Sequence, residues 1–114
     1  MTDSIEVSSI LDSAFARGRV NISITHENGN PNGLFITTDQ LEFSTQCQAI
    51  SRLGTALFQG GEPEQVLDGL YGIGDPTRGI MHSKGNKYSS FYAEVKEILE
   101  GMLNTLTECK KSGK

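Results

Sequence analysis

Hydrophobic and polar residues alternate from Val20 to Thr25, where every second residue is apolar. This period of two is typical of a strand with one buried face. The segment 27–33 is rich in Asn and Gly and predicts a turn, and the apolar run 34–38 predicts the returning strand of a hairpin. Residues 41–43 are interpreted as a short third strand. We therefore expect a small antiparallel sheet that needs a helical cover on one face.

Residues 1–19 allow two interpretations. Ile5 and Val7 alternate with polar residues as in a strand, whereas the apolar residues between positions 10 and 15 suit one face of a short helix. We expect a short strand or a turn of helix that leads into the sheet.

Helical spacing begins after Thr45, because Thr45-Gln46-Cys47-Gln48 has the form of a capping box. The apolar side of this helix is expected to hold Cys47, Ile50, Leu53, Gly54, Leu57 and Phe58. Ser51 and Thr55 then fall on the opposite side, with Arg52 near the edge. Gly54 indicates close packing against a strand or a partner helix, and Gly60-Gly61 ends the helix.

Two more helices are predicted further along the chain. The first has Pro63 at its first position and ends at Gly72, with an apolar face of Val66, Leu67, Leu70 and Tyr71. The second is capped by Ser89 or Ser90 and runs to about Thr107. Its apolar stripe comprises Phe91, Val95, Ile98, Leu99, Met102 and Leu106. The predicted fold class is therefore α+β, with a small antiparallel sheet covered by two main helices and one short helix.

The chain has 114 residues, which predicts a single domain over residues 1–114. Its net charge of −4 argues against a nucleic-acid polymer as partner. Cys47 and Cys109 have neither zinc-site nor disulfide-framework spacing, and Cys47 lies on an apolar stripe, which predicts a buried free thiol. With no signal peptide and no apolar run of membrane-spanning length in the sequence, we expect a cytoplasmic protein.

The polar segment 72–90 is the main candidate for chemistry, because it carries several cations and ends in two serines at a helix start. Free N–H groups at a helix N-terminus, with cations nearby, favour an anion. The expected ligand-binding residues are Arg52, Thr77, Arg78, His82, Lys84, Lys87, Tyr88, Ser89 and Ser90.

Each of these residues also has a structural interpretation. Arg78 can grip a phosphate with two N–H groups, or it can pair with Asp75 or Glu62. The two lysines can be ordinary surface residues, the two serines helix caps, and Arg52 one half of a salt bridge. Tyr88 is the better candidate for stacking on a base, since Tyr71 and Phe58 are expected in the core.

Signatures of catalysis are missing from the sequence. The sequence contains no recognisable Ser-His-Asp or Cys-His grouping. His26 and His82 are far apart in the sequence, so no metal-binding motif is found either. We therefore expect a binding protein without a cofactor, a metal or catalytic residues.

Three stretches together carry a family resemblance: Ala49-Ile50-Ser51-Arg52-Leu53, the run 60–67 that begins Gly-Gly-Glu-Pro-Glu, and Leu70-Tyr71-Gly72-Ile73. They resemble the TSCPD-type domain, which is found at the C-terminus of adenosylcobalamin-dependent ribonucleotide reductases and as small free-standing proteins. The resemblance covers roughly residues 34–103. It implies an accessory or regulatory role in ribonucleotide reduction as one alternative.

The chain departs from that family at its cysteines. The family has a cysteine near the position of Asp75 and then the T-S-C-P-D motif, where this chain reads Tyr88-Ser89-Ser90-Phe91-Tyr92. Ser90 replaces the motif cysteine, so the resemblance implies that any cysteine-based metal or redox role is lost.

In size and layout the chain is also similar to the phage anti-Thoeris sponge family, whose members fold as a small antiparallel sheet with two main helices. This second resemblance implies a homodimer or higher homo-oligomer in the host cytoplasm. It also implies a ligand of the cyclic ADP-ribose or cyclic oligonucleotide class, which the protein sequesters without cleaving it.

Overall fold

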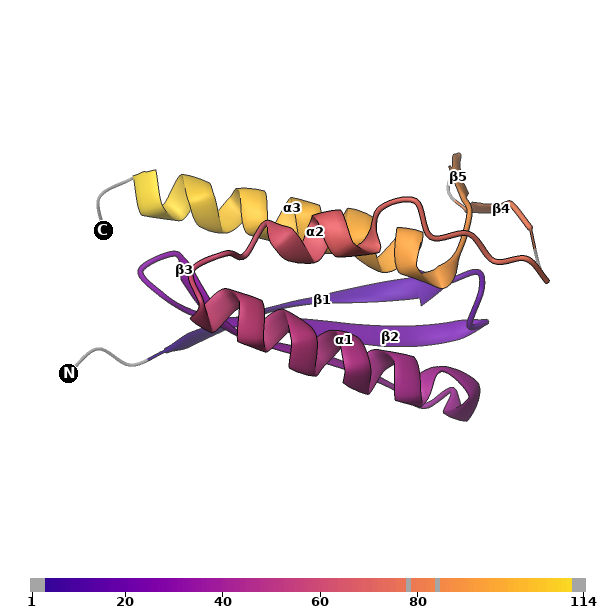
Figure 1. The fold of residues 1–114 in the computed structure, drawn as a ribbon, viewed down its shortest axis with the longest axis horizontal. Coiled ribbons are helices and arrows are strands. Elements are labelled where there is room, and N and C mark those ends of the chain that lie inside the picture. Colours follow the sequence, from indigo (N-terminus) through magenta and orange to yellow (C-terminus); the bar gives the residue numbers. More distant parts are fainter. Residues whose placement is uncertain (1–3, 78, 84, 112–114) are drawn as a thin grey trace.

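The computed structural model describes residues 4–77, 79–83 and 85–111 and has the predicted α+β fold. Three antiparallel strands form the main sheet in the order β1 (Ile5–Ser13), β2 (Gly18–Glu27) and β3 (Asn30–Thr38). The helices are α1 (Leu41–Gln59), α2 (Gln65–Leu70) and α3 (Phe91–Lys111), and a small hairpin of β4 (Met81–Ser83) and β5 (Asn86–Tyr88) precedes α3 (Figure 1).

The segment Ile5–Ser13 is a strand, so the first of the two interpretations holds for these residues. β1 pairs with β2 along its whole length, from Ile5 opposite His26 to Ser13 opposite Gly18. The positions from 10 to 13 that suited a helix face continue the same strand. Alternate residues of β1 face the core, so strand periodicity prevails over the local helical spacing.

The hairpin between β2 and β3 turns more tightly than the segment 27–33 suggested. Asn28 and Gly29 both have positive φ, at 52° and 85°. These angles are typical of the two-residue turns that join antiparallel strands. The buried His26 accepts a hydrogen bond at Nδ1 from the Gly29 N–H at 3.0 Å. The chain therefore re-enters the sheet at Asn30, and not at Leu34 as predicted.

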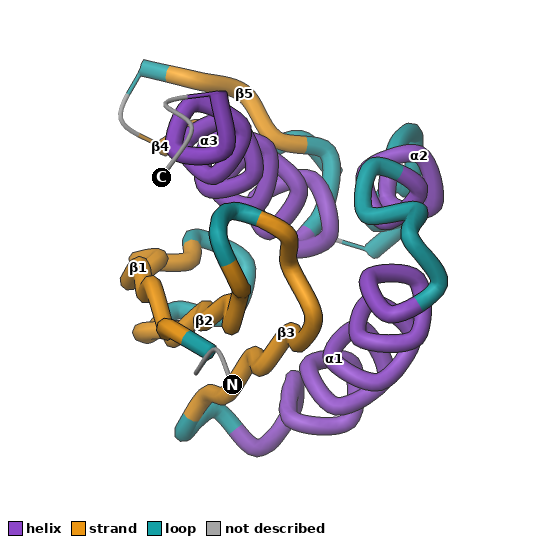
Figure 2. Tube along the Cα trace, turned by 90° about the vertical axis from the view of Figure 1, so that its left-hand side faces the viewer, coloured by secondary structure: helices purple, strands orange, loops and turns teal. Residues whose placement is uncertain are grey.

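Helix α3 lies over one face of the sheet and α1 lies along the β3 edge, and buried residues of all three helices join the sheet in one core (Figure 2). Three β2 side chains, Val20, Ile22 and Ile24, are fully buried at 0% exposure. They meet the α3 stripe, in which the prediction missed buried Leu103 and included Ile98, which is only half-buried. The opposite face of the sheet carries polar side chains, among which Ser8 and Ser23 share a hydrogen bond.

Helix α1 begins at Leu41, so two predictions about its start are wrong. Residues 41–43 are helical and do not form a strand, and Thr45 and Gln48 lie inside the helix rather than at its cap. Buried Phe43 explains the earlier start, because it extends the apolar stripe by one turn beyond Cys47.

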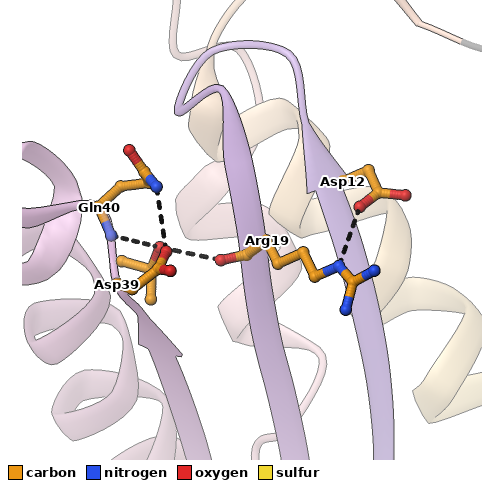
Figure 3. A network of polar contacts seen from close by, with 5 residues as sticks. Asp12, Arg19, Asp39 and Gln40 are labelled. Atoms are coloured by element: carbon orange, nitrogen blue, oxygen red, sulfur yellow. Dashed lines mark hydrogen bonds and ion pairs between the residues drawn. The ribbon is translucent and has the colours of Figure 1, made fainter.

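Thr38 anchors the chain just before α1. Its hydroxyl donates to the Arg19 carbonyl at 3.0 Å and accepts from the Gln40 N–H at 3.1 Å, which ties the start of the helix to β2 (Figure 3). The same view shows Arg19 on β2 next to Asp12 on β1, with 4.0 Å between Nε and Oδ1.

The side of α1 that was predicted to lie opposite the apolar stripe is also in contact with the sheet. Ser51 and Thr55 turn towards β3, where their hydroxyls accept hydrogen bonds from the N–H groups of Ile36 and Leu34 at 2.8 and 2.9 Å. Leu53, which was placed on the buried stripe, is 68% exposed. The expected close packing at Gly54 is confirmed, since an added Cβ would lie 2.3 Å from Leu34 Cδ2.

Helix α2 is shorter than predicted and ends at Leu70. Tyr71 adopts an extended backbone after the helix, and its side chain is 76% exposed rather than in the core. The predicted break at Gly72 is present, with φ of 80°. Within the segment 72–90, the β4–β5 hairpin was not anticipated from the sequence. None of the helices in the described part of the chain is long and apolar enough to cross a membrane.

Cys47 is a buried free thiol, as predicted. Burial raises the pKa of Cys47 from 9.0 to about 11, because the thiolate is poorly solvated there. A raised folded-state pKa means that the stability held by the neutral thiol is complete below pH 9 and falls as the pH rises towards 11.

In a Cys109→Ser variant we therefore expect the remaining thiol to react with an aromatic disulfide reagent at pH 8 much more slowly in the native protein than in urea. Fast reaction of the native protein would contradict the burial of Cys47.

Candidate functional site

The expected binding residues are only partly described by the structure. Arg78 and Lys84 lie outside the described residues. Thr77 is exposed, and its N–H donates to Asp75 Oδ1 at 2.8 Å in a tight turn. His82 on β4 is directly opposite Lys87 on β5, and both side chains are exposed. These residues share one end of the molecule.

Ser89 and Ser90 hold the segment after α2 against the start of α3. Both hydroxyls donate to the Ile73 carbonyl, from Ser89 at 3.1 Å and from Ser90 at 2.5 Å. The Asp75 N–H adds a bond to the Ser89 carbonyl at 2.8 Å. The chain before β4 is thereby fixed next to the chain after β5.

Ser90 is the cap of α3. Its Oγ accepts a hydrogen bond from the Ala93 N–H at 3.2 Å, and the residue is 2% exposed. A hydroxyl placed in this way satisfies one of the N–H groups that a helix start leaves open. Of the two alternative caps predicted from the sequence, the structure selects Ser90.

A groove of about 520 Å³ lies between the end of α2, strand β5 and the first half of α3. We call it the tyrosine groove. Its lining residues are Leu70, Tyr71, Gly72, Lys87, Tyr88, Ser89, Ala93, Lys96, Glu97 and Glu100. It combines two phenol rings, two ammonium groups, two carboxylates and a hydroxyl. Three of the expected residues, Lys87, Tyr88 and Ser89, meet here.

Lys96 lies near both a ring and a carboxylate of the tyrosine groove. Lys96 Nζ lies 5.8 Å from the centre of the Tyr71 ring and 3.7 Å from Glu100 Oε1. Burial, together with a hydrogen bond to Glu97 and the charge of that carboxylate, raises the pKa of Tyr88. Tyr88 therefore keeps its hydroxyl proton at neutral pH and presents a neutral ring and a hydrogen-bonded hydroxyl to the groove.

Arg52 does not join the other expected residues. It lines a separate hollow of about 500 Å³ between α1 and β3, beside Phe35, Thr37 and Gln48. Phe35 is 53% exposed on the outer face of the sheet. The walls of this hollow are mainly apolar, and two of its hydroxyls, those of Ser51 and Thr55, are already bonded to the backbone of β3.

The polar and aromatic groove residues that were not among the expected binding residues are Tyr71, Lys96, Glu97 and Glu100. Tyr71 was assigned to the apolar face of α2, but it comes one residue after the last helical position and directly before Gly72. Lys96 belongs to a polar face of α3 on which Ala93, Lys96, Glu97 and Glu100 follow one another at helical spacing. That polar face, continued back to Ser89, is the signal that could have found Lys96.

A comparison with known protein families matches residues 5–103 to the TSCPD domain. The chain belongs to the TSCPD family. The match extends from β1 into α3 and so includes the N-terminal strands, which the resemblance over residues 34–103 had left out. Comparisons with curated proteins and with solved structures found no match.

Ser90 is the residue that the sequence resemblance described above sets against the motif cysteine of the TSCPD family. The Ser90 hydroxyl bonds the Ile73 carbonyl and caps α3, as described above. A buried residue that joins a helix start to the preceding loop is a sufficient structural reason for a small polar side chain here.

Proposed function

We propose that this TSCPD protein binds a small nucleotide-derived ligand in the tyrosine groove and releases it unchanged. The observation that carries the proposal is the exposed ring of Tyr71 beside the Lys96 ammonium, 5.8 Å from its centre. An accessible ring offers a surface for stacking a base, and such stacking contributes about 1–3 kcal/mol per base. Ammonium groups next to it attract phosphate.

The remaining groups of the groove suit the rest of a nucleotide. Lys87 and Lys96 supply positive charge for phosphate, whereas Glu97 and Glu100 can accept hydrogen bonds from ribose hydroxyls or base amino groups. Gly72 leaves bare backbone beside the Tyr71 ring, because nothing lies within 4 Å of the position its Cβ would take. This mixture of charges favours a ligand that has both anionic and donor groups.

We propose binding without cleavage because the Ser89 hydroxyl, which lines the groove, is already engaged in a hydrogen bond. A serine nucleophile needs a base within hydrogen-bond reach. The Ser89 hydroxyl instead donates to the Ile73 carbonyl at 3.1 Å. Glu97 bonds to Tyr88, and Glu100 lies beside Lys96. The ligand class that we propose is the cyclic ADP-ribose isomers or the cyclic oligonucleotides, sequestered as a phage sponge would sequester them.

The first experiment measures the melting temperature with each of these ligands in excess. A ligand that binds only the folded protein raises the melting temperature. If no member of either ligand class raises the melting temperature, the proposal is wrong. Chromatography of the ligand recovered after denaturation then separates binding from hydrolysis, since a cleaved product would contradict the sponge role.

The Tyr71→Ala variant is expected to weaken ligand binding by about tenfold to a hundredfold, because a stacked ring contributes about 1–3 kcal/mol. Tyr71→Phe retains the ring and should bind nearly as the parent does. Isothermal calorimetry measures both variants. Arg52→Met serves as the control for the other hollow, and a large loss of binding in that variant alone would place the ligand between α1 and β3.

Membership of the TSCPD family favours a second candidate function, an accessory or regulatory role in ribonucleotide reduction. Such a role requires a complex with a ribonucleotide reductase subunit. Co-purification from cells that express both proteins tests it, and an unchanged elution volume of the mixture would argue against it.

A further inference from the structure

The backbone groups at the two edges of the main sheet have different partners. At the β3 edge, Ser51 and Thr55 on α1 bond the N–H groups of Leu34 and Ile36, and Thr55 also donates to the Leu34 carbonyl at 3.1 Å. Within the described part of the chain, β1 pairs only with β2 and no further strand continues the sheet beyond it (Figure 2). One edge is thus closed by side chains, and the other is an open row of backbone groups.

The pairing of the strands fixes which residues of β1 make up that row. Leu34 and Ile36 point their backbone groups at α1, so Phe35 between them bonds to its partner Ser23. The backbone N–H and C=O groups of Ile22 and Ile24 therefore point away from β3, towards Ser9 and Val7 of β1.

It follows that the even-numbered residues of β1 direct their N–H and C=O groups to the open edge. These residues are Glu6, Ser8, Ile10 and Asp12.

Apart from the charged residues Glu6 and Asp12, the open edge has little of the protection that natural edge strands carry. β1 is nine residues long, contains no proline, and pairs with β2 without a register shift. Ile5 and Ile10 are 59% and 60% exposed, and the core-facing Val7 and Leu11 are only half-buried. A long, regular edge strand with exposed apolar residues is a template for another strand.

We propose that β1 pairs antiparallel with β1 of a second copy, about a two-fold axis at Ser8. The two sheets then form one six-stranded sheet, three strands from each copy, with both α3 helices on the same face. Ser8 faces the partner's Ser8, and Glu6 faces the partner's Ile10, each with paired backbone hydrogen bonds. This inference is independent of the proposed ligand.

Charge and overlap together favour this register over the neighbouring symmetric ones, since an axis at Val7 pairs only residues 5–9 of β1 with one another. An axis at Ser9 would place Glu6 of each copy directly opposite Asp12 of the other copy. Like charges that face each other across two strands destabilise a sheet. An axis at Ile10 would pair Glu6 with Ala14, which lies beyond the end of β1 and whose N–H already donates to Glu94 Oε2 at 2.8 Å. An axis at Ser8 separates the carboxylates and pairs residues 4–12 with one another.

The first test measures the molar mass of the protein by size-exclusion chromatography with light scattering, at micromolar concentration. We expect a dimer, and we expect Ser8→Pro to be a monomer with an unchanged circular dichroism spectrum. Proline removes the outward N–H of Ser8, yet it is tolerated where no bond to β2 is lost. A monomeric parent protein would overturn the proposal, as would a Ser8→Pro variant that remains a folded dimer.

A cross-linking test covers the case in which Ser8→Pro does not fold. In a Cys109→Ser background, Ser8→Cys should form a disulfide-linked dimer on mild oxidation, because paired residues about the axis have Cα atoms about 5.5 Å apart. The matched control is Ser23→Cys, on the same face but one strand further in, 3.0 Å from the Ser8 hydroxyl. Equal cross-linking of both variants, or cross-linking of Ile10→Cys in place of Ser8→Cys, would overturn the register.

Discussion

Replacing Glu94 by alanine is expected to lower the free energy of unfolding by about 3–5 kcal/mol, because it removes the acceptor of several buried hydrogen bonds at once. The carboxylate is 1% exposed on α3 and accepts from the Ser13 hydroxyl at 2.6 Å and the Ala14 N–H at 2.8 Å. The Phe15 N–H lies 3.5 Å from the same group. Without Glu94, the turn between β1 and β2 loses its attachment to α3, and its donors remain buried without an acceptor.

Urea unfolding followed by circular dichroism measures this loss. Glu100→Ala is the matched control, since it removes a carboxylate from the same helix whose only described ion pair is the surface contact with Lys96. That variant should change stability by less than about 1 kcal/mol. Glu94→Gln keeps one acceptor oxygen and should fall between the two. A Glu94→Ala protein as stable as the parent would show that the turn finds other acceptors.

The parts of the fold that the sequence predicts are those in which one periodic pattern faces one environment. β2 alternates strictly because its inner side chains are fully buried and its outer ones are exposed or half-buried. The α3 stripe was predicted for the same reason, since the helix covers the sheet with one face. The anomaly in that stripe is Glu94, an acidic residue next to buried Val95, and its position within an apolar stripe could have indicated a buried carboxylate.

Polar residues on α1 could not be placed from the sequence. A pattern of apolar and polar positions assigns serine and threonine to solvent, but the edge of a sheet is itself polar. Ser51 and Thr55 face it because the strand's N–H and C=O groups need partners. The missed β4–β5 hairpin has a related cause, since strands of three residues carry no detectable periodicity.

The candidate site was predictable only in outline. The segment 72–90 does supply Lys87, Tyr88 and Ser89 to the tyrosine groove. Which other elements contribute depends on how α2 packs against α3, and no local pattern encodes that packing. Tyr71, which was predicted in the core, therefore lines the groove, whereas Arg52 lines a separate hollow between α1 and β3.

The double variant Ser51→Ala with Thr55→Val is expected to lose about 2–5 kcal/mol of stability. Each hydroxyl accepts a hydrogen bond from an edge N–H of β3, and a part-buried donor left without an acceptor costs about 1–3 kcal/mol. The two sites bond neighbouring positions of one strand, so their effects need not add. Thr45→Val, on an exposed position of the same helix, is the control and should stay within about 0.5 kcal/mol of the parent.

Amide hydrogen exchange distinguishes this mechanism from a general loss of packing. If the hydroxyls close the β3 edge, exchange at Leu34 and Ile36 should accelerate more than exchange at Phe35, whose N–H bonds to β2 on the other side of the strand. Equal acceleration at all three positions would mean that α1 stabilises β3 through apolar packing and that the hydroxyls are incidental. The alternating pattern is expected because consecutive residues of an edge strand point their backbone groups in opposite directions.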